Sequence, residues 1–134
     1  MRRGALIAPV ASLVACGSQA SAVPDRFSGT WKLTDGRTIP IRRVANGEGA
    51  AALRALRGSP CKTPAVYYRS TYFNGVAHMA GCATGDGQVM RGRFNDRGIT
   101  GSLFMRWQNS KRFAAIVHGD GHAPFTVVAV RIRP

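Results

Sequence analysis

Residues 88–107 read QVMRGRFNDRGITGSLFMRW, and this stretch decides the fold. On both sides of its centre, apolar or small residues alternate with polar ones, which is the period of a β-strand with one buried face. The residues between the two halves, 95–98 (NDRG), are the types that form tight turns. We therefore predict an antiparallel hairpin with Met90, Phe94, Leu103 and Met105 on one face.

The same alternation continues in both directions along the chain. The predicted strands span residues 27–34, 38–44, 65–73, 76–82, 88–94, 99–107, 113–117 and 125–133. Residues 50–57 (AAALRALR) are rich in helix formers, and we expect a short helix between the second and third strands, beginning near Glu48 or Gly49. Eight strands with short turns favour an all-β fold, an eight-stranded up-and-down antiparallel barrel, because closure removes sheet edges. A β-sandwich is the alternative.

Length and charge bound the domain organisation and the partners. The chain has 134 residues, enough for one small domain, which we place at residues 27–134. Its formal net charge is +13, with 19 basic and 6 acidic residues. This balance suits anionic partners, such as nucleic acid, the anionic head groups of lipopolysaccharide or phospholipid, or an acidic protein.

The N-terminus has the order of a secretory signal. Two arginines precede an apolar run over residues 5–15, which is too short for a transmembrane helix of about 20 residues. The four residues that end at Cys16 (LVAC) resemble the lipobox of bacterial lipoproteins. The resemblance implies a signal peptide over residues 1–15, lipid on Cys16, a flexible tether over residues 16–26, and anchoring on the outer membrane facing the periplasm. The alternative is cleavage after Ala22 (ASA), which would release a soluble periplasmic or secreted protein.

The three cysteines fit the lipoprotein interpretation. If Cys16 carries lipid, Cys61 and Cys82 remain to form a disulfide in an oxidising compartment. Two free thiols are the alternative. Neither cysteine belongs to a C-x-x-C motif, so we expect no zinc or redox site.

The tripeptide of residues 29–31 (GTW) resembles the G-x-W signature of lipocalin-type and avidin-type barrels, with Gly29 and Trp31 as its fixed positions. It is also similar to the small bacterial metalloprotease-inhibitor barrels of the Inh type. The resemblance implies a calycin-type barrel in which Arg131 or Arg133 of the last strand packs over Trp31. The helix position departs from that of lipocalins, and the avidin ligand pattern is not recognisable, so no ligand residues are carried over.

Four arginines fall on the strand faces opposite the apolar residues, where they would lie on the outer wall of a barrel. They are Arg69, Arg91, Arg93 and Arg106. With Tyr67, Phe73 and Phe104 nearby, this face is a candidate site for an anionic partner. A solvated outer face is the alternative interpretation. An envelope location makes nucleic acid an unexpected partner.

The most metal-like segment is residues 118–122 (HGDGH), where His118 and His122 flank a carboxylate. The two glycines give the loop no preset geometry, and we interpret it as a polar hairpin tip with no metal. The sequence has no G-x-S-x-G motif, and its few carboxylates lie mostly in turns. We therefore expect no enzymatic activity and no cofactor.

The leading hypothesis is a non-enzymatic envelope lipoprotein that acts as a binding or inhibitor module, through one barrel mouth or through the arginines. One alternative is a structural envelope protein that docks on anionic lipid or on a complex. Another is a carrier of a small apolar ligand. Gly92, Gly101 and Ala115 would leave room inside the barrel, whereas Met90 and Phe94 would fill it.

Overall fold

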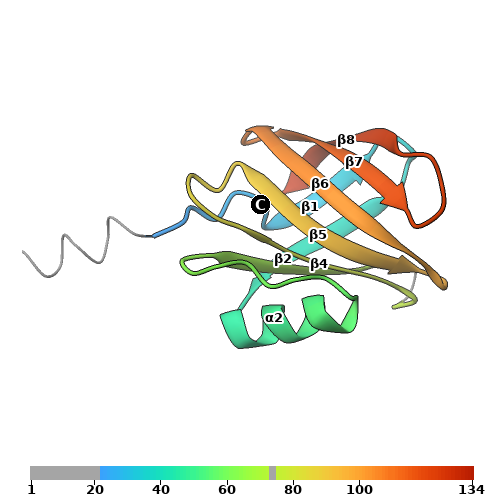
Figure 1. The fold of residues 1–134 in the computed structure, drawn as a ribbon. Coiled ribbons are helices and arrows are strands. Elements are labelled where there is room, and N and C mark those ends of the chain that lie inside the picture. The colour runs from blue at the N-terminus through green and yellow to red at the C-terminus, as the bar shows by residue number, and fades with distance from the viewer. Residues whose placement is uncertain (1–21, 73–74) are drawn as a thin grey trace, which may run out of the picture.

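The computed structural model describes residues 22–72 and 75–134, and within these ranges eight strands and one helix make up the fold (Figure 1). The strands are β1 (Gly29–Leu33), β2 (Thr38–Val44), β3 (Val66–Tyr72), β4 (Ala77–Ala83), β5 (Val89–Asp96), β6 (Ile99–Asn109), β7 (Arg112–Gly119) and β8 (Phe125–Arg133). Each strand pairs antiparallel with the next, and β1 also pairs with β8, so the sheet closes into an up-and-down barrel. The predicted fold class is confirmed, and the sandwich alternative is excluded.

The stretch at residues 88–107 forms the hairpin of β5 and β6 as predicted. Met90 lies opposite Met105 in the pairing register, and both side chains are buried in the core. In the turn, Arg97 and Gly98 both have positive φ, at 54° and 92°. This conformation twists the chain in the same sense as the strands that it joins. The alternation of residue types and the turn chemistry thus specify the same hairpin.

The helix α2 (Asn46–Ala55) packs on the outside of the barrel against β3 and β4. Leu53 is buried there beside Tyr67 and Cys82. Gly49 also faces Tyr67, and a Cβ at Gly49 would overlap the Tyr67 side chain, so only glycine permits this close approach. The outer face of β3 and β4 around Tyr67 and Cys82 is therefore covered, and this part of the wall is not available to a partner.

The helix begins two to three residues earlier than expected. Its first residue is Asn46, and Ala45 before it has an extended backbone. Glu48, which was expected near the start, lies in the first turn. Its carboxylate favours that position because it interacts well with the positive end of the helix dipole.

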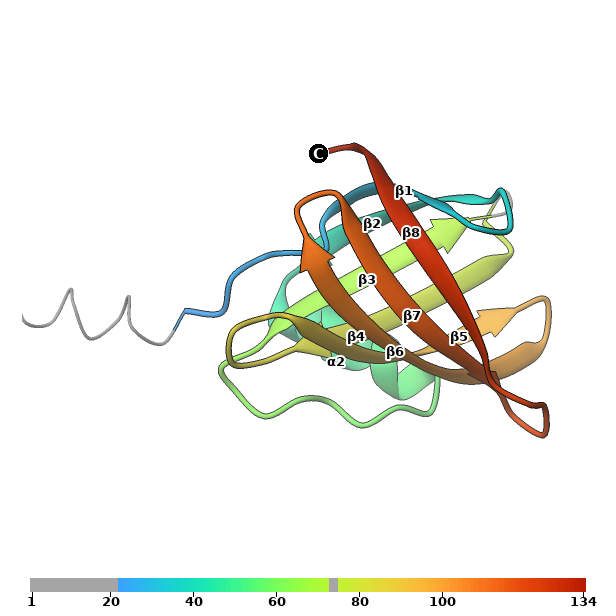
Figure 2. The same ribbon diagram turned by 90° about the horizontal axis from the view of Figure 1, so that it is seen from above.

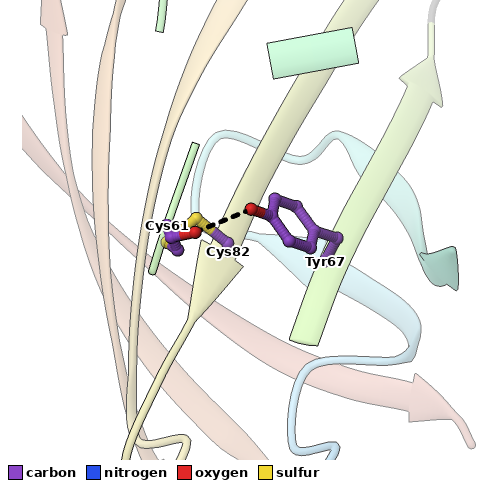
Figure 3. Close-up of a disulfide and its surroundings, with 3 residues drawn as sticks. All are labelled: Cys61, Tyr67 and Cys82. Carbon is purple, nitrogen blue, oxygen red and sulfur yellow. Dashed lines mark hydrogen bonds between the residues drawn. A yellow bond between two sulfur atoms is a disulfide. The ribbon is translucent and has the colours of Figure 1, made fainter. Parts of the chain in front are cut away.

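The disulfide between Cys61 and Cys82 is present, as predicted, with its two Cα atoms 6.2 Å apart. It fastens the loop that follows α2 to β4. The Tyr67 hydroxyl donates a hydrogen bond to the Cys61 carbonyl oxygen at 3.1 Å beside the bridge (Figure 3). The bridge and the hydrogen bond together hold the loop and the helix against the barrel.

The two ends of the barrel differ. The loops at residues 34–37, 97–98 and 120–124 gather at one end, which we call the mouth (Figure 2). Residues 22–28 and the β6–β7 turn lie at the other end, which we call the closed end (Figure 2). Within the described ranges, no helix has the length and apolar character needed to cross a bilayer.

Candidate functional site: a cavity inside the barrel

A cavity of about 470 Å³ occupies the barrel interior toward the mouth. Most of its wall is apolar: Leu33, Ile39, Met79, Phe94, Ile99, Leu103, Met105, Phe113, Ala115, Val117, Ala123, Phe125 and Val127. The polar side chains that reach it are those of Arg37, Ser70, Tyr72, Asp96 and His122. The volume lies in the range of small-molecule sites, roughly 300–1,000 Å³. The interior is therefore only partly filled by side chains.

Aromatic side chains fill the closed end and form the floor below the cavity. Phe27 is fully buried, and its ring meets the rings of Tyr68 and Phe113 edge-on at 5.7 and 5.6 Å. The Trp31 ring packs on Phe113 at 4.6 Å, and its Nε1 donates to the Phe27 carbonyl oxygen at 2.9 Å. Burial raises the pKa of the Tyr68 hydroxyl to about 12, with a smaller contribution from Asp25. This end is a packed core that leaves access only from the mouth.

Arg131 fastens the closed end from outside. Its guanidinium lies 4.2 Å from the centre of the Trp31 ring, in the position that the G-x-W resemblance implied. It donates hydrogen bonds to three carbonyl oxygens, those of Ser28, Arg26 (3.0 Å) and Ser110 (2.6 Å). A Cβ at Gly29 would collide with this guanidinium, which explains the glycine. These residues stabilise the fold rather than contact a ligand in the cavity.

An ionic cluster lies on one side of the mouth. Arg37 pairs with Asp35 at 2.7 Å and with Asp96 at 3.3 Å, and its guanidinium lies over the Tyr72 ring. Burial raises the pKa of the Tyr72 hydroxyl above its ordinary value. The cluster ties the β1–β2 turn to β3 and β5, and it fixes the shape of the entrance.

Ser70 is the one buried polar residue of the barrel core within the described ranges. It is 4% exposed and lines the cavity from β3. Its Oγ has no hydrogen-bond partner among the residues that the structure describes. Buried hydroxyl groups are nearly always hydrogen-bonded in proteins, so this one requires an explanation.

The four predicted arginines lie on the outer wall of β3, β5 and β6, and two of them pair with carboxylates. Arg69 pairs with Glu48 of the helix at 3.2 Å, and Arg93 pairs with Asp120 at 2.9 Å. Arg93 also donates to the Leu56 carbonyl oxygen at 3.1 Å. Both guanidiniums thus hold the helix and a mouth loop against the barrel, and they are less available to an anionic partner.

Arg91 and Arg106 remain together on the outer face of β5 and β6. Their guanidinium carbons lie 4.9 and 5.6 Å from the centre of the Phe104 ring. Both side chains are exposed, and neither forms a salt bridge with an acidic residue of the described ranges. These two arginines and the aromatic ring between them form a cluster that we call the Phe104 patch.

The histidine loop contains no assembled metal site. Asp120 accepts hydrogen bonds from Arg93 and from the Thr100 hydroxyl, and the Arg93 bond is the main cause that lowers the pKa of this carboxyl group. His118 lies on an outward-facing strand position, whereas His122 lines the cavity mouth. Across residues 22–72 and 75–134, no group of three side chains of metal-ligand type comes together.

Cys16, the predicted lipidation site, and Phe73, a predicted aromatic neighbour of the arginines, lie outside the described residues. The chain matches no protein-family model and no curated protein. The cavity and the Phe104 patch are therefore the features from which a function can be inferred.

Sequence reasoning missed the polar residues of the cavity. A signal was present for Ser70, because Tyr68, Ser70 and Tyr72 alternate on one face of the third predicted strand. That face carries the buried Tyr68, so Ser70 had to point inward. Arg37 and Asp96 gave no comparable signal, since both lie in or beside turns where charged residues are ordinary.

Proposed function

We propose that this protein is a non-enzymatic carrier that binds a small, mainly apolar ligand inside its barrel. The observation that carries the proposal is the apolar cavity of about 470 Å³, which side chains of the mouth loops line in part. A ligand there would gain free energy by removing apolar surface from water, and the packed aromatic floor would limit how far it enters.

The rim of the mouth supports entry of an apolar molecule. Ile99 and Phe125 line the cavity and are 53% and 51% exposed, although such large apolar side chains are usually buried. They give the entrance an apolar side, which adjoins the cluster around Arg37 where Ile99 pairs with Asp96 in the sheet. An apolar ligand can therefore pass along a continuous apolar surface from solvent to the interior.

The test uses two neighbouring alanines on β7. Ala115 is buried and lines the cavity, whereas Ala114 has the opposite orientation on the outer face. We expect wild type and Ala114→Phe to bind the apolar dye N-phenyl-1-naphthylamine saturably, with enhanced fluorescence. Ala115→Phe should weaken binding at least tenfold while urea unfolding shows a folded protein. Unchanged dye affinity in folded Ala115→Phe would contradict the carrier proposal.

The Phe104 patch supports a second candidate function, docking on an anionic lipid surface. Two exposed guanidiniums flank an aromatic ring there, and the net charge of +13 favours approach to a negative membrane. Arginine side chains bind phosphate groups through two parallel hydrogen bonds. Among the arginines of the predicted anionic-partner site, those of the patch form no salt bridge with a carboxylate of the described residues.

Vesicle sedimentation tests this candidate. We expect binding to vesicles that contain phosphatidylglycerol, with affinity falling as salt rises. Arg91→Gln with Arg106→Gln should reduce binding several-fold. The control is Arg43→Gln with Arg54→Gln, which removes the same charge from exposed positions elsewhere. If both double variants lost the same vesicle affinity, net charge alone would explain the binding, and the patch would not be a docking site.

We also propose that the protein lies in the bacterial envelope, anchored through lipid on Cys16. The disulfide supports an oxidising compartment, because such bridges are rare in the cytoplasm. Cys16→Ser should abolish lipid labelling and membrane fractionation. Unchanged membrane fractionation of this variant would contradict the lipid anchor, whereas recovery of wild type in the soluble fraction would favour the form cleaved after Ala22.

A further inference from the structure

We propose that the ligand carries a neutral hydrogen-bonding oxygen, a carbonyl or a hydroxyl, within its buried apolar part, and that Ser70 binds this oxygen. The inference rests on the proposed carrier function and specifies its ligand class. It distinguishes a lipid-like ketone, ester or alcohol from a plain hydrocarbon.

The inference depends on the position of Ser70 in the barrel wall. On β3 it lies between Ile41 of β2 and Met79 of β4, so its cross-strand neighbours offer only apolar side chains. Ser70 is 4% exposed and lines the cavity, and its buried Oγ has no hydrogen-bond partner among the described residues. A hydroxyl group can donate one hydrogen bond and accept two. A ligand oxygen in the cavity would supply the missing partner.

The charge of the ligand oxygen follows from the surroundings of Ser70. Arg37 and Asp96, the charged groups at the cavity, pair with each other at the mouth, and they retain side-chain exposures of 27% and 18%. Ser70 precedes Tyr72 by two residues on β3 and therefore lies deeper in the barrel, further from the mouth. An ionised group at that depth would lose its hydration without a charged partner, which is far more costly than burial of a neutral oxygen. The oxygen is therefore neutral.

A matched pair of ligands tests the inference. The probes are 2-acetylnaphthalene and 2-ethylnaphthalene, which have nearly the same shape and differ in one carbonyl oxygen. Their affinities are measured by displacement of N-phenyl-1-naphthylamine from the wild type, Ser70→Ala and Thr71→Ala. The last variant is the control, because Thr71 is the exposed neighbour on the same strand and loses the same hydroxyl outside the cavity.

We expect Ser70→Ala to reduce the affinity ratio of ketone to hydrocarbon by about tenfold, the effect of one lost buried hydrogen bond. Thr71→Ala should leave the ratio unchanged. Equal ratios in wild type and Ser70→Ala, with both probes bound, would overturn the Ser70 inference and leave the carrier proposal standing. Failure of both probes and the dye to bind wild type would overturn both proposals.

Discussion

The replacement Arg131→Met removes the guanidinium that fastens the closed end and keeps an apolar stem of similar length. The variant loses hydrogen bonds to the carbonyl oxygens of Ser28, Arg26 and Ser110, and the cation–π contact with Trp31 at 4.2 Å. The bonds to Ser28 and Arg26 are partly buried, whereas the bond to Ser110 is exposed and contributes little. Two charge-assisted bonds and the ring contact together are worth about 3–5 kcal/mol. That is a large part of the free energy of unfolding of a small domain, about 5–15 kcal/mol.

Urea unfolding followed by tryptophan fluorescence measures this loss, and Arg133→Met is the matched control. Arg133 lies on the same strand with an exposed side chain, so its replacement should change the free energy of unfolding by less than about 0.5 kcal/mol. Arg131→Lys should also be destabilising, because an ammonium group cannot reach several acceptors with a planar fork. Equal stability of Arg131→Met and Arg133→Met would refute the role of Arg131 at the closed end.

Three further predictions concern stability. Replacing Cys61 and Cys82 by serine removes a link between residues 21 positions apart and should lower the free energy of unfolding by about 3 kcal/mol, as measured in urea. If reduction of the wild-type disulfide left the free energy of unfolding unchanged, the bridge would not have this stabilising role. In the helix, Gly49→Ala should lower the stability of the protein by about 1–3 kcal/mol, because the added methyl group would overlap the Tyr67 side chain. Gly47→Ala should raise the stability by about 0.5–1 kcal/mol, because Gly47 has open space around it. Thermal melts that rank the two variants in the opposite order would contradict the close packing of Gly49 on the barrel. Because the folded pKa of Tyr68 is raised to about 12 from about 10, its contribution to stability is complete below pH 10 and is lost as the pH rises to 12. Urea titrations over this range should show a fall in stability of up to about 2 kcal/mol that Tyr68→Phe removes; the same fall in that variant would assign the effect to other groups.

The barrel could be predicted from the sequence because local signals agree with the overall topology. The alternation of residue types predicted that Met90, Phe94 and Met105 lie inside the barrel, and the turn residues predicted the positions of the hairpins found in the structure. The helix start was less well determined. No side chain caps its first turn, since Ala45 is the N-cap residue, so the usual sequence marker of a helix start is missing.

The site was harder to predict than the fold. The alternation of strand positions predicted that Arg69 and Arg93 point outward from the barrel. Their partners are Glu48 and Asp120, which lie 21 and 27 positions away in the sequence, and the alternation does not predict such distant contacts. The alternation also could not predict whether side chains fill the barrel interior. That depends on how far Phe113 and Met105 reach across the barrel, and the residue types alone do not give this distance.

The proposals for the anchor, the Phe104 patch and the cavity are mutually consistent in their geometry. The described chain begins at Ala22, six positions after Cys16, and enters at the closed end (Figure 2). Six residues span at most about 20 Å, so lipid on Cys16 would hold the closed end close to the membrane. Arg91 and Arg106 lie near the β4–β5 and β6–β7 connections, toward this same end. They would then face lipid phosphates, while the mouth and Ser70 would open away from the bilayer. A ligand would therefore exchange with the aqueous side, which suits a carrier better than a protein that extracts lipid directly from its own membrane.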